Sequence, residues 1–242
     1  MTEIFHSKNF SYINNNNTKL TKTYIWSDDI QRIRATGFIY QCLLYINRIS
    51  ICALILTSDN KYIACYRKHS FLYTEIIRSR NVFRKKRLFM KYAKYLRKKE
   101  RQYLLNELNI DNSLTNETND HRNIIFPGGQ PKIGEDFFLC LAREIKEEIN
   151  IDTKNISIDY RFFIHMFIDD LLIDRVYETI LFLGKTDLSS DDILNNFLSN
   201  REITSIVFLD TFDEGIHGDI IRFVLSVSKL KCLEKKENNI QL

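Results

Sequence analysis

The stretch GQPKIGEDFFLCLAREIKEEINI, from Gly129 to Ile151, carries the strongest structural signal in the sequence. Its apolar residues recur every three or four positions, which is the spacing of an amphipathic helix, and we expect that helix over Asp136–Ile149. The opposite face carries Glu144, Glu147 and Glu148 at positions i, i+3 and i+4. The stretch therefore predicts a helix that is held by its apolar face and presents a cluster of carboxylates.

The negative face of this helix needs a counter-charge. Three carboxylates so close together repel one another, and a hard divalent cation such as Mg²⁺ or Mn²⁺, which prefers oxygen ligands, would neutralise them. Arg143 can pair with Glu147 one turn on, or with Glu135 at the start of the helix. An acidic surface helix crossed by salt bridges would explain the charges, but not their spacing or the glycine-rich entry.

Glycine and proline are scarce, with 7 and 2 among 242 residues, so their positions are informative. Both prolines and three of the glycines lie between Pro127 and Gly134, directly before the helix. This clustering indicates a loop whose backbone approaches another group closely. The hydrophobic content of 44% excludes a largely disordered chain.

These features together match the Nudix box, a motif of fixed spacing that contains Arg-Glu-aliphatic-x-Glu-Glu-x-Gly-aliphatic. The positions in register are Gly129, Glu135, Arg143, Glu144, Ile145, Glu147, Glu148 and Ile151. Asn150 replaces the final glycine of the motif, and this departure is conservative because Asn also adopts left-handed backbone at a helix end.

Further stretches resemble the poxvirus Nudix mRNA-decapping enzymes, in particular the late-expressed type. They are RKHSFLYTEIIRSRNVFRKKRLF, FPGGQPK, REIKEEINID and RFFIH, and the resemblance covers most of residues 30–230. It implies a Nudix fold of the α/β (α+β) class, with a mixed sheet sandwiched between helices and interrupted by a basic helical insertion. It also implies cleavage of the pyrophosphate linkage of the mRNA cap, which releases 7-methylguanosine diphosphate and 5′-monophosphate RNA. Turnover of host and viral mRNA, and shutoff of host gene expression, would follow.

The resemblance also implies roles for particular residues. The metal ligands for Mg²⁺ or Mn²⁺ would be Glu144, Glu147 and Glu148, with the Gly128 carbonyl as a further ligand. The general base would be one of these glutamates or Glu178, and the sequence does not decide between them. Gly129, Glu135 and Arg143 would support the motif.

A methylated guanine is cationic, so its pocket should combine aromatic faces with a carboxylate for the guanine edge. In the resembling family the cap ring is held between two aromatic residues, and the matching positions are Phe71 and Tyr177, with Asp170 as the acid. Each of the three could equally be a packed or a surface residue. His165 lies among apolar residues, and we expect it to be a buried core histidine.

The net charge of +4 hides an asymmetry along the chain. Residues 67–101 hold 14 basic and 2 acidic residues, a local charge of +12, which leaves 21 basic and 29 acidic residues, or −8, elsewhere. The run Arg84, Lys85, Lys86 and Arg87 offers a track for RNA phosphates. Aromatic residues interleave with this region at helical spacing, which more often indicates a core than a platform for bases.

Periodicity and composition, read with the family resemblance, suggest five regions. They are an irregular N-terminal arm over 1–30, a first part of the Nudix domain over 31–69, the basic helical insertion over 70–120, the rest of the Nudix domain over 121–232 with the box at 129–151, and a C-terminal tail over 233–242. Apolar runs at 51–56 and 62–66 predict a hairpin, and residues 71–108 predict two or three amphipathic helices.

The sequence also bears on location and partners. An odd number of cysteines without C-x-x-C spacing favours reduced thiols in an intracellular protein, and no apolar run is long enough to span a membrane. We expect the host-cell cytoplasm, leave open a peripheral association with an organelle surface such as that of mitochondria, and expect capped mRNA as the partner, with no protein partner.

Two other functions compete with mRNA decapping. A small-nucleotide diphosphatase would share the box, but it would not need the basic insertion. A catalytically inert RNA-binding protein on a Nudix scaffold would share the insertion, but it would not need the intact glutamate set.

Overall fold

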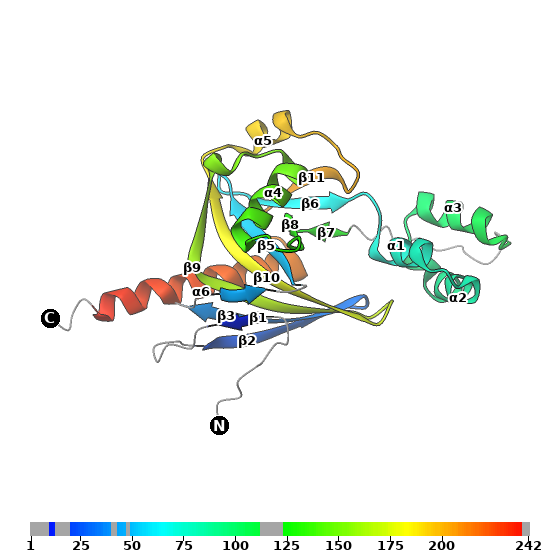
Figure 1. Ribbon diagram of the computed structural model, residues 1–242, viewed down its shortest axis with the longest axis horizontal. Coiled ribbons are helices and arrows are strands. Elements are labelled where there is room, and N and C mark those ends of the chain that lie inside the picture. Colours follow the sequence, from blue (N-terminus) through cyan, green and yellow to red (C-terminus); the bar gives the residue numbers. More distant parts are fainter. Residues whose placement is uncertain (1–9, 13–19, 40–42, 47–48, 112–122, 239–242) are drawn as a thin grey trace, which may run out of the picture.

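The computed structural model describes residues 10–12, 20–39, 43–46, 49–111 and 123–238. It contains a large mixed sheet with helices on both faces (Figure 1). The strands are β1 (Phe10–Tyr12), β2 (Leu20–Ser27), β3 (Gln31–Ile39), β4 (Leu43–Ile46), β5 (Ser50–Leu56), β6 (Tyr62–Arg67), β7 (Ile124–Ile125), β8 (Gly128–Gly129), β9 (Ile156–Asp170), β10 (Arg175–Thr186) and β11 (Ile203–Leu209). The helices are α1 (Phe71–Arg78), α2 (Val82–Tyr92), α3 (Lys98–Leu108), α4 (Phe137–Ile149), α5 (Ser190–Asn196) and α6 (Ile216–Asn238).

The main sheet runs in the order β11-β6-β5-β10-β9-β3-β2. Its central pair, β5 and β10, is parallel, whereas the other pairs in this order are antiparallel. Both central strands are rich in β-branched and other apolar residues because both of their faces are covered. Short strands β7 and β8 join the sheet through β6 and β5.

Helices α4 and α6 bury opposite faces of the sheet. The apolar side of α4, through Leu141, Ile145 and Ile149, packs in one core cluster with β5 and β10. Helix α6 contributes Ile221 and Val224 to a second cluster with β3 and β9. The expected mixed sheet between helices is therefore confirmed, and the carboxylate helix is held by a core as its periodicity predicted.

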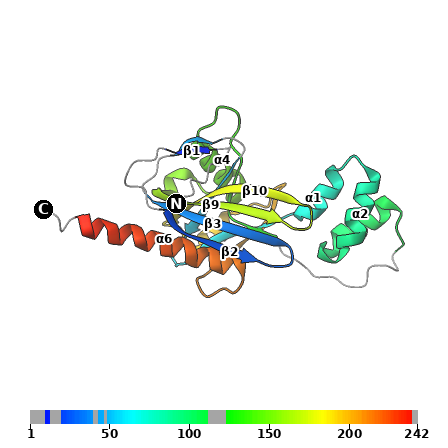
Figure 2. The ribbon, with the colours of Figure 1, turned by 90° about the horizontal axis from the view of Figure 1, so that it is seen from below.

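The basic insertion, α1 to α3, projects beyond the end of β6, on the side where the β9–β10 turn lies (Figures 1 and 2). It has a small core of its own, which includes Leu72, Phe89 and Leu104. Leu172 and Ile173, in the turn between β9 and β10, belong to the same cluster. The insertion is thereby packed against the hairpin that carries Asp170 and Tyr177.

Several local expectations are confirmed and two are corrected. The hairpin at 51–56 and 62–66 is formed by β5 and β6, and residues 71–108 form three helices. The proposed irregular arm over 1–30 is wrong where β2 lies, because this strand pairs with β3 at the edge of the sheet. The proposed tail over 233–242 is wrong up to Asn238, where α6 ends. Within the described ranges, no helix is long and apolar enough to span a bilayer.

Candidate active site

The two glycines of β8 bring the backbone against both β5 and α4. Gly128 has a φ of +146°, and a Cβ there would overlap the Ile51 carbonyl of the neighbouring strand. A Cβ at Gly129 would lie 2.5 Å from Cδ of Glu144. The glycine-rich entry is therefore required by the close approach of backbone to a carboxylate of the box helix.

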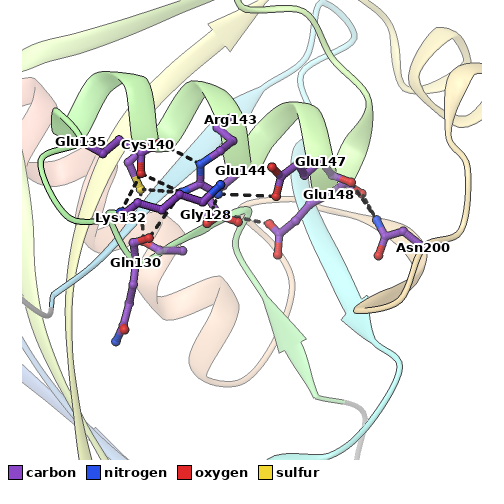
Figure 3. Close-up of polar contacts among 11 residues, drawn as sticks. Gly128, Gln130, Lys132, Glu135, Cys140, Arg143, Glu144, Glu147, Glu148 and Asn200 are labelled. Atoms are coloured by element: carbon purple, nitrogen blue, oxygen red, sulfur yellow. Dashed lines mark hydrogen bonds and ion pairs between the residues drawn. The ribbon is translucent and has the colours of Figure 1, made fainter.

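Arg143 is the centre of an ion-pair network on α4 (Figure 3). Its Nε and Nη2 atoms donate to the two carboxylate oxygens of Glu135, each at 2.8 Å, and its Nη1 donates to Glu144 at 2.6 Å. A longer contact of 3.5 Å reaches Glu147. The hydrogen bonds from Arg143 lower the pKa of Glu135 to about 2. Both pairings expected for Arg143 occur, and the pairing with Glu135 has the better geometry.

Glu148 is the buried member of the glutamate set. Its side chain is 5% exposed, and Oε2 accepts a hydrogen bond of 2.8 Å from the Gly128 N–H. Burial raises the pKa of Glu148 to about 8, and the negative charges of Glu144 and Glu202 act in the same direction. Glu147 differs, because its side chain is 58% exposed at the surface of the helix.

The C-terminal end of α4 is held by two asparagines. Asn150 adopts left-handed backbone with a φ of 55°, which confirms it as an effective replacement for the glycine of the motif. Asn200, from the loop before β11, donates from Nδ2 to the carbonyls of Glu147 at 2.9 Å and Glu148 at 3.3 Å (Figure 3). Sequence reasoning missed Asn200, because no local pattern marks a contact across more than fifty residues.

The donor set fits a divalent cation in its chemistry. Glu148 is a buried carboxylate whose ionised form is disfavoured where it lies, and Glu144 adds a second negative charge beside it. A bound cation would relieve both costs. Among the described residues, no three acidic, histidine or cysteine side chains already converge on one point, so binding would require the glutamate side chains to move closer together.

A cavity of about 450 Å³ joins this helix to the insertion. Glu148 and Gly128 line it, and so do all three candidate cap-binding residues, Phe71, Asp170 and Tyr177. The structure therefore brings together, in one cavity, residues from four distant parts of the chain. Its size is in the range of ordinary small-ligand sites.

The two aromatic candidates face each other across part of this cavity. The ring centroids of Phe71 and Tyr177 are 5.6 Å apart and the rings are tilted by 38°. A planar base stacked on both faces needs a separation of about 7 Å, or two van der Waals contacts, so the rings must open slightly to admit one. Asp170 Oδ1 accepts backbone N–H groups of Leu172 and Ile173 at 3.0 and 3.2 Å, which fixes the turn beside Tyr177.

Glu178, the alternative general base, lies outside this cavity. Its neighbours Tyr177 and Thr179 line the cavity, and successive strand residues point to opposite faces of a sheet. Glu178 Oε1 instead lies 2.8 Å from Nε2 of His165, and both side chains are less than a tenth exposed. His165 is thus a buried histidine, as expected, and burial lowers its pKa.

Glu202, which sequence reasoning missed, is a further carboxylate of the cavity. It precedes β11 in a polar loop, and its charge acts on Glu148. The sequence offers no periodicity or motif that would single it out.

The four basic candidates for RNA binding divide into two pairs. Arg84 and Lys85 form ion pairs of 2.8 Å with Glu75 and Glu107 of the insertion, whereas the side chains of Lys86 and Arg87 are exposed. The aromatic residues that interleave with these basic residues fall into two groups. Phe89 is fully buried in the core of the insertion, whereas Phe83 is 87% exposed.

Known proteins resemble the chain at two levels. A family model described as Viral D10 N-terminal matches residues 3–45. The mRNA-decapping protein OPG122 of Monkeypox virus is 46% identical over 94% of this chain and 92% of its own length, and the mRNA-decapping protein D10 of Fowlpox virus is 38% identical over 87% and 93%. Among solved structures, an Ap4A hydrolase binary complex from C. elegans covers 77% of this chain and 98% of its own, with 12% identity and a TM-score of 0.40.

Proposed function

Because the chain belongs to the family of poxvirus mRNA-decapping proteins, we propose that it is a decapping hydrolase of the Nudix type. It would cleave the pyrophosphate linkage of the 5′ cap and release 7-methylguanosine diphosphate and 5′-monophosphate RNA. The observation that carries this proposal is the single cavity in which Phe71, Asp170 and Tyr177 lie together with Gly128 and Glu148. Such a cavity fits a ligand with an aromatic base at one end and phosphates at the other.

Each end of the cavity has a distinct task. Phe71 and Tyr177 would stack on the cationic methylguanine, and Asp170 would accept from the guanine edge. Glu144, Glu147 and Glu148, with the Gly128 carbonyl, would hold Mg²⁺ or Mn²⁺. That ion, when bound, would polarise a phosphoryl oxygen and make a bound water more acidic. Arg143, with Glu135, keeps the Glu144 carboxylate beside Gly129.

The general base accepts a proton from the attacking water and must reach it from within the cavity. Glu148 and Glu202 line the cavity, so they are favoured. Glu144 and Glu147 lie on the box helix next to Glu148 but are not part of the cavity lining, so either would have to turn toward the water. Glu178, which the family resemblance suggests from strand β10, is the least favoured candidate because it contacts His165 on the other face of the sheet. Variants of Glu144, Glu147, Glu178 and Glu202 to Gln would separate them by the loss of the acidic limb of the pH–rate profile.

The insertion would bind the body of the mRNA. Lys86 and Arg87 offer exposed charges to RNA phosphates, and Arg84 and Lys85 are available there if their internal ion pairs open. We further propose that the protein is made late in infection and acts in the host-cell cytoplasm on host and viral mRNA. Peripheral association with an organelle surface stays a prediction.

The decisive experiment uses the full chain and RNA whose cap phosphates are radiolabelled. Incubation with Mg²⁺ or Mn²⁺ should release methylated GDP, and the Glu147→Gln, Glu148→Gln double variant should release it about 100-fold more slowly or not at all while still binding RNA. The control is Asp187→Asn, which neutralises an exposed carboxylate just beyond β10 and should behave as wild type. Unchanged turnover in the double variant would refute the assignment of the metal ligands.

The same assay separates the two rival functions. A small-nucleotide diphosphatase would hydrolyse free cap dinucleotide or a nucleoside triphosphate as well as capped RNA. An inert RNA-binding protein would bind capped RNA and release no methylated GDP with either ion.

A further inference from the structure

Arg67 lines the same cavity as the aromatic pair Phe71 and Tyr177 and the carboxylate of Glu148. It ends β6, where its backbone N–H donates to the Asn123 carbonyl at 3.1 Å, and it precedes Phe71 by four residues. Its guanidinium carbon lies 4.0 Å from the centroid of the Phe71 ring. The Arg67 guanidinium therefore covers one face of the Phe71 ring. The cationic base is proposed to bind against this same ring and Tyr177.

One donor of this guanidinium is unused. Nη1 of Arg67 is buried, and among the described residues it has no hydrogen-bond partner. Burial lowers the pKa of Arg67, while the charges of Glu202 and Glu148 and the Tyr177 side chain act in the opposite direction. A buried, charged donor without an acceptor is costly, which is a reason to expect that a ligand supplies the acceptor.

We propose that Arg67 binds the diphosphate of the methylated nucleotide and links the base-binding end of the cavity to the glutamate end. This inference rests on the proposed decapping function. When the base enters, the guanidinium leaves the Phe71 face, and its fork of N–H groups donates to phosphate oxygens, which match it in charge and geometry. Arg67 is thus a specificity residue that distinguishes a nucleotide from a nucleoside.

The test measures ligand affinity by calorimetry on the full chain, in EDTA, so that no turnover occurs and the protein's own groups account for binding. The ligands are 7-methylguanosine diphosphate, 7-methylguanosine and unmethylated GDP. Wild-type protein should bind the methylated diphosphate about 10- to 100-fold more tightly than the methylated nucleoside, as expected for charge-assisted hydrogen bonds. Arg67→Gln should reduce this ratio to about 3-fold or less and leave nucleoside affinity equal or improved, and Arg67→Lys should be intermediate.

Arg34→Gln is the matched control. Arg34 also lies over a ring, 5.1 Å from the centroid of Phe167, but it pairs with Asp169 and is not part of the cavity lining. It should keep the wild-type ratio. Equal weakening of nucleoside and diphosphate in Arg67→Gln, or an unchanged ratio, would overturn the inference. If wild-type protein did not distinguish methylated from unmethylated GDP, the cap assignment would fail, whereas loss of the diphosphate preference in Arg67→Gln would still support the role of Arg67.

Discussion

The backbone at Gly129 lies so close to the Glu144 carboxylate that any Cβ would compete with it. In Gly129→Ala the carboxylate must move, because it is the flexible partner, and its hydrogen bond to Arg143 would be lost. We expect turnover to fall about 100-fold while the free energy of unfolding changes by about 1 kcal/mol or less. Decapping rates and urea denaturation of the same preparation would test this.

Gly128→Ala provides the contrast for that experiment. Its Cβ would meet the Ile51 carbonyl, which belongs to the backbone of a central strand and cannot yield, and its φ is positive. We expect a loss of several kcal/mol in stability, about 3 kcal/mol or more. A Gly129→Ala variant with wild-type turnover would show that the position of Glu144 is not needed for catalysis.

The raised pKa of Glu148 predicts a pH-dependent stability. The ordinary pKa of a glutamate is 4.5, and the pKa of Glu148 in the folded protein is about 8. Between pH 4.5 and pH 8 the folded state therefore keeps a proton that the unfolded state has released. The contribution of protonated Glu148 to the free energy of unfolding is therefore complete below about pH 4.5 and is lost as the pH rises through 8. Over that range the free energy of unfolding should fall by at most about 1.4 kcal/mol per pH unit. Urea midpoints in EDTA should fall more steeply with pH for wild type than for Glu148→Gln.

Addition of Mg²⁺ sharpens this measurement. At pH 8 the ion should restore stability to the wild-type protein, because it favours the ionised carboxylate, and restore less to Glu148→Gln. Parallel pH profiles for the two proteins in EDTA would contradict the assigned pKa shift.

At the scale of single residues, sequence spacing predicted contacts within the box helix and its entry loop, and missed the contacts that a distant loop makes with this helix. The pairing of Arg143 with Glu135 and the left-handed Asn150 follow from positions a few residues apart, where backbone geometry decides what can meet. Asn200 and Glu202 reach α4 only because the loop before β11 folds back on it. No local rule encodes that approach.

At the scale of elements, a buried carboxylate within the insertion holds the start of α1, where Phe71 of the aromatic pair lies. Glu100 of α3 is 5% exposed and accepts from the Ser70 backbone N–H at 2.7 Å and from its hydroxyl at 2.8 Å. Ser70 is the N-cap of α1, and Phe71 is the first residue of that helix. Glu100 therefore positions Phe71 without touching the ligand.

Glu100→Gln should weaken the affinity for methylated GDP about 3- to 10-fold, because one of the two acceptors becomes a donor and the start of α1 loosens. The rate of cleavage at saturating capped RNA should change less than 2-fold, since the glutamate end of the cavity is untouched. Calorimetry and saturation kinetics would separate the two effects. Glu107→Gln, an exposed position on the same helix, should leave the affinity for methylated GDP unchanged.

Helices and strands with a regular apolar pattern were predictable from the sequence, whereas the edge strand β2 was not. The box helix, the β5–β6 hairpin and the helices of the insertion bury a full face, so their periodicity is strong. Among the strands that the structure describes, β2 has only one sheet neighbour, β3, and its residues Tyr24 and Ile25 are exposed while Trp26 is buried. Its polar surroundings concealed a strand that depends on β3 for its hydrogen bonds.

At the scale of the whole molecule, the uneven charge separates RNA binding from catalysis. The local charge of +12 over residues 67–101 belongs almost entirely to the projecting insertion, and the remaining −8 belongs mostly to the sheet and its helices. RNA should thus be attracted to one side of the molecule and repelled by the rest, which would direct the 5′ end toward the cavity between them.

This arrangement predicts the salt dependence of RNA binding. The Lys86→Gln, Arg87→Gln double variant removes two exposed charges that form no ion pair with any other described residue. RNA binding should therefore weaken, and the slope of log affinity against log salt should fall by about 1.4, or 0.7 per phosphate contact of a single strand. The control removes two exposed lysines from the acidic body, Lys154→Gln with Lys185→Gln, which changes the net charge equally. Equal slopes for both double variants would mean that net charge, and not the insertion, governs RNA binding. A reduced slope in the insertion variant alone, with unchanged affinity for methylated GDP, would place RNA binding and cap binding on separate surfaces.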